Sequence, residues 1–399
     1  MELAMFLCIA PIVYLTTYLL VPYARKCALC WGAIDKPDQR RVNRYAVPRC
    51  GGIALMGGVL VGFVMLNYLL VASGYANGLP IGIVVGTNAL FAIGLWDDII
   101  QLRPLRKLIG QIVASMCIVA TGVCPSVTGV YQCDFVCAVG FLVVTVNAIN
   151  LIDGLDGLAS GVCSVIATGF LIVAAVHGLV VPFVLSMVML AICGAFLLFN
   201  RYPARIFMGD SGSLLLGALV GVIALLEIAP MPQDPMNICS LMCMIGVPFC
   251  DIFTAVVRRM RRHQSIFKAD TNHLHHCLLH AGYGPRQAVR YLVALSGVAV
   301  AAGCLLAFSN GFVCLFTLIL YGILFGLVIE KTHVTDADTR AQRVSAVRGL
   351  SQQCMPLSSA HSTTPVHRRI NAIIYCWLRW MCRSKNLQLH TAPDVVIKE

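Results

Sequence analysis

The chain has 399 residues and a mass of 43.1 kDa; 59% of its residues are apolar, only 12% are charged, and its mean hydropathy is +0.83. Soluble domains carry about a quarter charged residues, so this composition excludes a soluble globular protein, and it also excludes a disordered chain or a disulfide scaffold. The sequence is that of an integral membrane protein with a net charge of +11.

A spanning helix needs about 20 mostly apolar residues to cross roughly 30 Å of hydrocarbon. Eleven runs bounded by turn residues or charges come near this length. We therefore predict an all-α membrane domain with eleven transmembrane helices over residues 1–330. The runs lie near 3–24, 51–73, 79–96, 108–123, 135–149, 158–176, 180–199, 212–229, 236–257, 288–308 and 311–330.

The basic residues give this domain an orientation. All 29 Lys and Arg fall in one set of the alternating loops, in the helix ends beside those loops, or in the tail after residue 330. Basic loops face the cytoplasm, so we predict an outside N-terminus and a cytoplasmic C-terminus. The basic face is expected to attract membrane lipids with anionic headgroups or an anionic substrate. No motif for binding nucleic acid occurs in the sequence.

Carboxylates at a membrane boundary are energetically costly and therefore indicate function. Asp97 and Asp98 end the third run. Because successive side chains on a helix point about 100° apart, the two acids cannot share one partner and could instead bridge a metal and a substrate. The alternative is a pair of solvated acids beside Arg103, Arg106 and Lys107.

Two further segments combine short polar residues with glycine. In the first, residues 147–157, Asn and Asp recur every third position; they could bind a nucleotide's base and sugar, ligate Mg²⁺, or only cap their own helix end. In the second, residues 207–213, Asp210 or Ser211 is expected to be a helix N-cap, with open backbone N–H groups for an anion or its metal. Capping alone is the simpler alternative.

The largest predicted cytoplasmic loop joins an arginine cluster at 258–262 to three histidines within 273–276. Guanidinium groups match phosphate oxygens, and histidines bind phosphate, bind metal or move protons. A zinc site is weakly supported, because only Asp270 stands nearby as a further ligand. The rule that basic loops face the cytoplasm explains the arginines but not the histidines.

Asp251 lies within the ninth run, seven residues before Arg258 and on the same helix face. Ion-coupled transporters also use acids within the membrane, but their sites usually lie near the bilayer midplane at a repeat interface. Here the other acids line one face and no internal repeat is visible, which favours an enzyme.

Residues 331–399 read as a flexible, basic cytoplasmic tail. Within it, 366–383 has apolar residues at helical spacing between arginines, which predicts an amphipathic helix lying on the membrane or on the protein's own cytoplasmic face. Cys124 and Cys133 share one predicted outer loop and could pair in an oxidising compartment.

Five segments, in this order, carry a family resemblance: the Asp97-Asp98 pair, NAINLIDGLDGLASG (147–161), RIFMGDSGSLLLG (205–217), PFCDIFTAVVRR (248–259) and DTNHLHH (270–276). In motif and spacing they resemble the polyprenyl-phosphate N-acetylhexosamine-1-phosphate transferase family. The resemblance implies an eleven-helix fold in the bacterial inner membrane, an active site on the cytoplasmic face, and a homodimer.

It also implies a reaction, in which a sugar 1-phosphate passes from a UDP-N-acetylhexosamine to undecaprenyl phosphate and UMP is released. The expected cofactor is Mg²⁺, with Mn²⁺ as an alternative. Such a reaction is the first membrane step of cell-envelope polysaccharide synthesis, for example of lipopolysaccharide or teichoic acid.

By the same resemblance, Asp97 deprotonates or orients the lipid phosphate, as a base or as a covalent nucleophile, with Asp98 beside it, and Asp210 binds the metal. The nucleotide sugar is expected to contact Asn150, Asp153, Asp156, Phe207, Arg44 and Arg49. The diphosphate is expected to contact His273, His275, His276 and Arg258.

Two features resemble the N-acetylglucosamine-1-phosphate branch of this family. Gln101 stands where the peptidoglycan branch has Lys, and His-Leu-His-His replaces three consecutive histidines. The alternatives are the phospho-N-acetylmuramoyl-pentapeptide transferase of peptidoglycan synthesis and transfer of a different N-acetylhexosamine 1-phosphate. Asn43 replaces a frequent His, which leaves the role of its loop, with Arg44 and Arg49, less defined.

Overall fold

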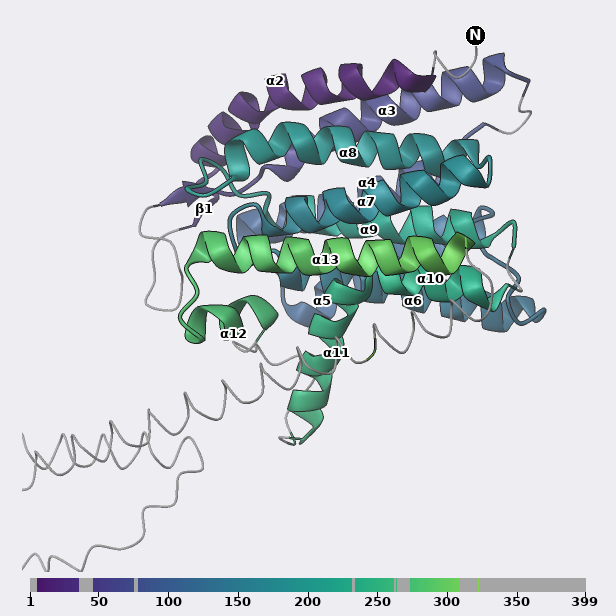
Figure 1. Cartoon of the computed structure of the whole chain (residues 1–399). Coiled ribbons are helices and arrows are strands. Elements are labelled where there is room, and N and C mark those ends of the chain that lie inside the picture. The colour runs from purple at the N-terminus through teal and green to yellow at the C-terminus, as the bar shows by residue number, and fades with distance from the viewer. Residues whose placement is uncertain are drawn as a thin grey trace, which may run out of the picture. The chain divides into compact units, whose positions relative to one another are not determined.

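The computed structural model describes residues 6–35, 46–74, 78–231, 234–261, 263, 273–308 and 322. Long helices lie side by side in a bundle, and one of them, α11, leaves the bundle at a steep angle (Figure 1). The helices are α2 (Ile9–Cys30), α3 (Gly52–Ala72), α4 (Ile81–Ile100), α5 (Pro104–Ala120), α6 (Tyr131–Ile152), α7 (Leu158–Val176), α8 (Val180–Asn200), α9 (Gly209–Ile228), α10 (Pro235–Met244), α11 (Gly246–Arg261), α12 (Leu274–His280) and α13 (Pro285–Phe308).

The chain is a multi-pass α-helical membrane protein. Within the described residues, seven helices are long and apolar enough to span a membrane, or eight if α10 and α11 count as one bent span. Ten of the eleven predicted runs coincide with helices. The run 311–330, apart from residue 322, and the tail with its amphipathic helix near 366–383 lie outside the described residues. The count of eleven and the outside N-terminus therefore stay predictions.

The ninth run, 236–257, is not one straight helix. It consists of α10 and α11, which are bent by 78° at the break between them. Pro248 lies in the first turn of α11, where a backbone N–H would have no partner within the helix, so its absence costs no hydrogen bond. Within a continuous helix, Pro248 would remove a hydrogen bond and clash with the preceding turn. Asp251 is therefore carried away from the axis of α10.

Helix α9 forms the centre of the bundle. It contacts α3, α4, α6, α7, α8 and α10, and 94% of the residues in its most apolar stretch are buried. A helix that is apolar all round is expected to be enclosed in this way. At Gly94 of α4, an added Cβ would lie 2.3 Å from the carbonyl oxygen of Asp210. This close approach of backbones places the end of α4 beside the start of α9.

A short hairpin joins α2 to α3 at the same end of the bundle. Strand β1 (Ile34–Asp35) pairs antiparallel with β2 (Val47–Pro48). The Phe207 N–H donates to the Pro48 carbonyl at 2.9 Å, so the hairpin also anchors the segment that leads into α9. Residues 36–45, including Arg44, lie outside the described residues. At the other end of the bundle, Cys124 and Cys133 are free thiols.

Candidate functional site

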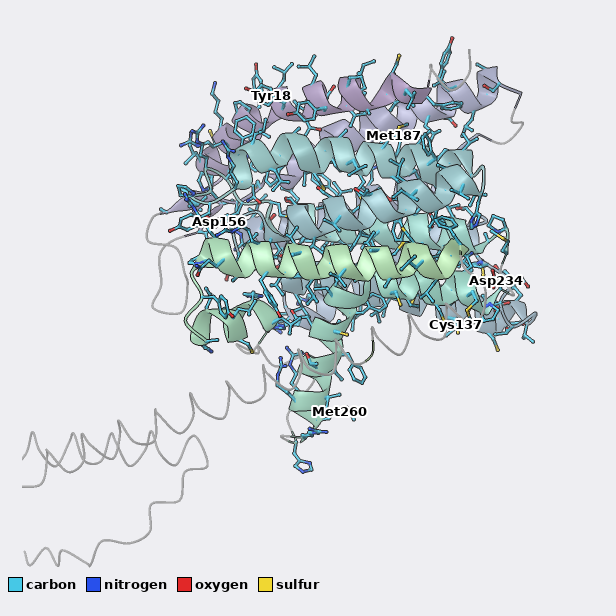
Figure 2. The ribbon with its side chains drawn as sticks, in the orientation of Figure 1. Tyr18, Cys137, Asp156, Met187, Asp234 and Met260 are labelled. Carbon is cyan, nitrogen blue, oxygen red and sulfur yellow. The ribbon has the colours of Figure 1, made fainter. Side chains whose placement is uncertain are left out.

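A polar cleft of about 290 Å³ lies at the end of the bundle that carries the hairpin and α12. Figure 2 shows Asp156 at this end and Asp234 at the opposite end. The cleft is lined by Asp35, Arg49, Asn150, Asp153, Gly154, Leu155, Asp156, Asn200, Phe207, Gly209, Asp210, His275 and His276. Eight of the residues predicted to form the site are among them.

Asp98 is buried and holds the start of α9. Its Oδ1 accepts from the backbone N–H of Asp210 at 2.8 Å, and its Oδ2 accepts from the backbone N–H (3.0 Å) and the hydroxyl (2.7 Å) of Ser211. An Nη of Arg49 lies 3.2 Å from Oδ1. The prediction that Asp210 or Ser211 is the N-cap is wrong, because both lie within the first turn of α9 and the cap comes from another helix.

Asp97 faces a different partner, as the helical spacing of the two acids predicts. The Lys107 ammonium lies 2.9 Å from Asp97 Oδ2 and donates to Asp210 Oδ2 at 2.7 Å. The other oxygen of Asp97 accepts from the backbone N–H of Leu102, in the short turn between α4 and α5. Lys107 therefore joins two acids from different helices at the edge of the cleft.

Asn150, at the end of α6, completes the surroundings of Asp210. Its Nδ2 donates to Asp210 Oδ1 and to the Ser213 hydroxyl, both at 2.8 Å. One turn earlier on α6, the amide of Asn147 donates to Oε1 of Gln111 at 2.7 Å, which ties α6 to α5. Of the regular polar positions in 147–157, one thus faces the acid cluster and another faces α5.

The loop between α6 and α7 supplies the two remaining acids of the motif. Burial raises the pKa of Asp153 to about 8, and the nearby charges of Asp210 and Asp98 add to this effect. Burial also raises the pKa of Asp156, although the backbone N–H of Ala204, which donates to Asp156 Oδ2 at 2.9 Å, acts against it. Both carboxyls line the cleft, and the first carries its proton near neutral pH.

Asn200, at the end of α8, fixes the far wall of the cleft. Its Oδ1 accepts from the Gly157 N–H and its Nδ2 donates to the Ile206 carbonyl, both at 3.0 Å. The half-buried Phe207 follows directly, and its backbone lies beside that of Arg49 in a parallel β-bridge. An aromatic ring on the wall of a polar cleft is suited to stacking on a planar base.

The three histidines stand at the start of α12. The ring of His273 stacks on that of His275, with 6.0 Å between centroids, and the His275 and His276 centroids are 4.2 Å apart. Burial lowers the pKa of His275 to about 3, so this ring is neutral near neutral pH. A Cβ on Gly154 would lie 2.2 Å from Nε2 of His275, so this position requires glycine for close approach.

The structure does not gather every predicted residue at the cleft. Arg258 lies on α11 and does not line it, and Arg44 lies outside the described residues. Conversely, Lys107 makes central contacts that the sequence did not single out, and Ser211, predicted as an alternative N-cap, instead donates to Asp98. Lys107 was visible only as one of several basic residues after Asp98, and nothing in its spacing distinguished it from Arg103 or Arg106.

The acid cluster has the composition of a partial cation site. Among the described residues, no three His, Cys, Asp or Glu side chains converge as an all-protein metal site requires. Mg²⁺, however, is usually held by one or two carboxylates together with water and substrate phosphates. Asp210 and Asp97 supply such oxygens, and with Asp98 they carry one negative charge more than Arg49 and Lys107 balance. These residues fit Mg²⁺ bound together with a phosphate.

Comparison with known proteins gives the family of the chain. Residues 80–227 match the glycosyl transferase family 4 model. A relative in Bacillus subtilis strain 168, described as a probable undecaprenyl-phosphate N-acetylglucosaminyl 1-phosphate transferase, is 32% identical over 332 residues, which cover 81% of this chain and 90% of that protein. The chain belongs to the polyprenyl-phosphate N-acetylhexosamine-1-phosphate transferase family.

Two further relatives match most of the chain at 27% and 32% identity. The decaprenyl-phosphate N-acetylglucosaminephosphotransferase of Mycolicibacterium smegmatis is 32% identical over 71% of this chain and 77% of its own length. The undecaprenyl-phosphate alpha-N-acetylglucosaminyl 1-phosphate transferase of Escherichia coli O157:H7 is 27% identical over 80% of this chain and 89% of its own length. The chain is therefore a membrane transferase of this family, and the similarity extends well beyond the region of the family model.

Proposed function

We propose that this protein transfers N-acetylglucosamine 1-phosphate from UDP-N-acetylglucosamine to undecaprenyl phosphate and releases UMP. The observation that carries the proposal is the cluster in which Asp97, Asp98 and Asp210, from two helices, meet Lys107 and Arg49 at the edge of the cleft. The printed names of the relatives, each of which names N-acetylglucosamine and a polyprenyl phosphate, support the choice of donor and acceptor.

The reaction brings two negatively charged phosphates together. A lipid phosphate oxygen bonds to the sugar-bound phosphorus of the donor, while the bond from that phosphorus to the bridging oxygen breaks and UMP leaves with this oxygen. Catalysis of such a transfer depends mainly on positioning and charge neutralisation. Lys107 supplies a fixed positive charge between Asp97 and Asp210, and Asp97 accepts the proton of a monoprotonated lipid phosphate.

Asp210 would hold Mg²⁺, or Mn²⁺ in its place, through its carboxylate oxygens. The bound ion supplies positive charge that offsets the charge of the two phosphates. Phe207 stacks on the uracil, and Asn150, Asp153, Asp156 and Arg49 bind the nucleotide sugar from the other walls of the cleft. His275 and His276 close the cleft on the side of the diphosphate.

The basic loops of the sequence support a cytoplasmic position for this end of the bundle, where nucleotide sugars are available. The protein then acts in the bacterial inner membrane, at the first membrane step of a cell-envelope polysaccharide such as lipopolysaccharide or teichoic acid.

Release of UMP by purified protein in detergent tests the proposal. The donors compared are UDP-N-acetylglucosamine, UDP-N-acetylgalactosamine and UDP-N-acetylmuramoyl-pentapeptide, each with undecaprenyl phosphate and with or without Mg²⁺. We expect Mg²⁺-dependent release from UDP-N-acetylglucosamine alone. Release only from the pentapeptide donor would move the protein to peptidoglycan synthesis, and no release from any donor would refute the reaction.

A matched pair of variants ties the result to the cleft. Asp210→Asn is expected to abolish release, whereas Asp234→Asn is expected to retain it. Asp234 is an exposed acid at the opposite end of the bundle, where its side chain accepts from the Met236 N–H, and asparagine also serves as an N-cap.

A further inference from the structure

Asp251 is a fully buried acid on α11 that the proposed chemistry does not use. Its Oδ1 accepts from the backbone N–H of Leu274, the first residue of α12, at 2.9 Å. Its Oδ2 lies 3.3 Å from Nδ1 of His273, which is itself 5% exposed, and neither of these two atoms makes a hydrogen bond to any described residue. One carboxylate thus contacts both the backbone and the side chain at the start of the histidine segment.

These contacts connect Asp251 to the cleft through neighbouring rings. His273 stacks on His275 with an angle of 6° between the planes, and the ring of His275 is close to that of His276. Only the last two histidines line the cleft. Asp251 therefore contacts His273 but does not line the cleft, whereas His275 and His276 do.

A carboxylate beside one imidazole nitrogen has a defined chemical effect. A carboxylate only accepts hydrogen bonds, so Asp251 favours the form of His273 that carries its proton on Nδ1. The proton on Nδ1 leaves Nε2 as the ring nitrogen that accepts a hydrogen bond from its surroundings. Since α12 has only seven residues, its position also depends on contacts from outside the helix.

We infer that Asp251 is a positioning residue of the transferase. It holds the first turn of α12 and selects the Nδ1–H form of His273, so that the histidines are already oriented when the diphosphate of the nucleotide sugar binds. The identity of that ligand rests on the proposed function, whereas the pairing of Asp251 with His273 does not.

The substitution Asp251→Asn tests the pairing with little change of shape. Asparagine keeps an oxygen that can accept from the Leu274 N–H, but it turns an N–H toward Nδ1 of His273 and so favours the other form of the ring. We expect kcat to fall roughly 10- to 100-fold, as for loss of a group that orients a catalytic histidine or metal ligand, with the KM for UDP-N-acetylglucosamine little changed.

Thr254→Val is the matched control. Thr254 is buried on the same helix, and its hydroxyl donates to the carbonyls of Cys250 and Asp251 in its own helix and to no other described residue. We expect its kcat to stay near that of the wild type. An Asp251→Asn variant as active as Thr254→Val would overturn the inference.

A double-mutant cycle shows whether Asp251 acts through His273. In a His273→Gln background, Asp251→Asn is expected to cause no further loss of kcat, because the ring that it orients is already absent. If the two losses multiply, Asp251 has an independent structural role and the inference fails.

A stability comparison covers the case in which Asp251→Asn does not fold. The amide of His273→Asn takes the place of Nδ1 and can still donate to Asp251, whereas the longer side chain of His273→Gln leaves that carboxylate unpaired. We expect a lower Tm for His273→Gln than for His273→Asn, and equal values would overturn the pairing. This readout needs no substrate, so it remains informative even if the wild type releases no UMP and the proposed function fails.

Discussion

Helix α9 carries an acid at each end, half-buried in the first turn and fully buried in the last, and the two have opposite surroundings. Asp210, in the first turn, has both carboxylate oxygens engaged, one by Lys107 and one by Asn150. Glu227, in the last turn, is 0% exposed, and neither of its carboxylate oxygens has a hydrogen-bond partner among the described residues. The nearby Asn237 donates at 3.2 Å to the backbone carbonyl of Glu227 and not to its side chain.

The difference indicates which end of the helix is built to hold charge. A buried charge is strongly unfavourable unless partners and hydrogen bonds compensate for it. The compensation at Asp210 comes from two other helices and keeps an anion in place for chemistry. At Glu227 no described side chain provides it, so the two ends should respond differently when their acids are neutralised.

Neutralising Asp210 should have the largest effect. Asp210→Asn removes the proposed oxygen ligand for Mg²⁺ and one partner of Lys107, so we expect kcat to fall roughly 10³-fold or more. The rate of UMP release with saturating UDP-N-acetylglucosamine measures it. Activity within tenfold of the wild type would contradict the role of this end of α9.

Removing the cation should come next. Lys107→Gln keeps a polar side chain but leaves Asp97 and Asp210 close together without the positive charge between them. We expect kcat to fall roughly 100-fold, comparable to the loss of one group that stabilises transition-state charge. Lys107→Arg should recover part of the rate. Equal rates in both variants would show that the charge is not what matters.

Changing the cap of α9 should affect stability as well as activity. Asp98→Asn replaces one carboxylate oxygen by an NH₂ group, which cannot accept from the backbone N–H groups that now donate to Asp98. A buried donor left unsatisfied costs about 1–3 kcal/mol. We expect a lower Tm in detergent together with a roughly tenfold fall in kcat. An unchanged Tm would mean that the start of α9 does not depend on Asp98.

Neutralising Glu227 should have the smallest effect. Glu227→Gln loses no hydrogen bond made by a described residue, so we expect UMP release to stay within about twofold of the wild type and the Tm to be equal or higher. The same two assays measure it. A loss of activity like that of Asp210→Asn would remove the distinction between the two ends of the helix.

Much of the fold could be predicted from the sequence, because hydropathy records how much apolar chain is available to span a membrane. The run 180–199 corresponds to Val180–Asn200, and the run 51–73 to Gly52–Ala72. Hydropathy does not indicate where a helix bends, so the bend before α11 could not be predicted from it, although Pro248 is visible in the sequence.

The candidate site divides in a similar way. The motifs predicted that Asn150, Asp153 and Asp210 belong to one site, because each stands next to a helix end at the same face. All three line the cleft. The partners of these acids could not be predicted, because they depend on how close separate helices approach one another. The contact of Asp98 with Ser211 spans 113 residues, and no local pattern encodes it.

The central position of α9 has a consequence for biogenesis. Among the described helices that make its main contacts, α3, α4, α6, α7 and α8 precede it in the chain, and α10 follows. Synthesis proceeds from the N-terminus, so most of its protein neighbours are already inserted when α9 emerges. A ribosome-stalled chain that ends before α9 would leave those neighbours around an unfilled centre. Insertion of α9 then completes the acid cluster with Asp210, before α12 brings its histidines to the cleft.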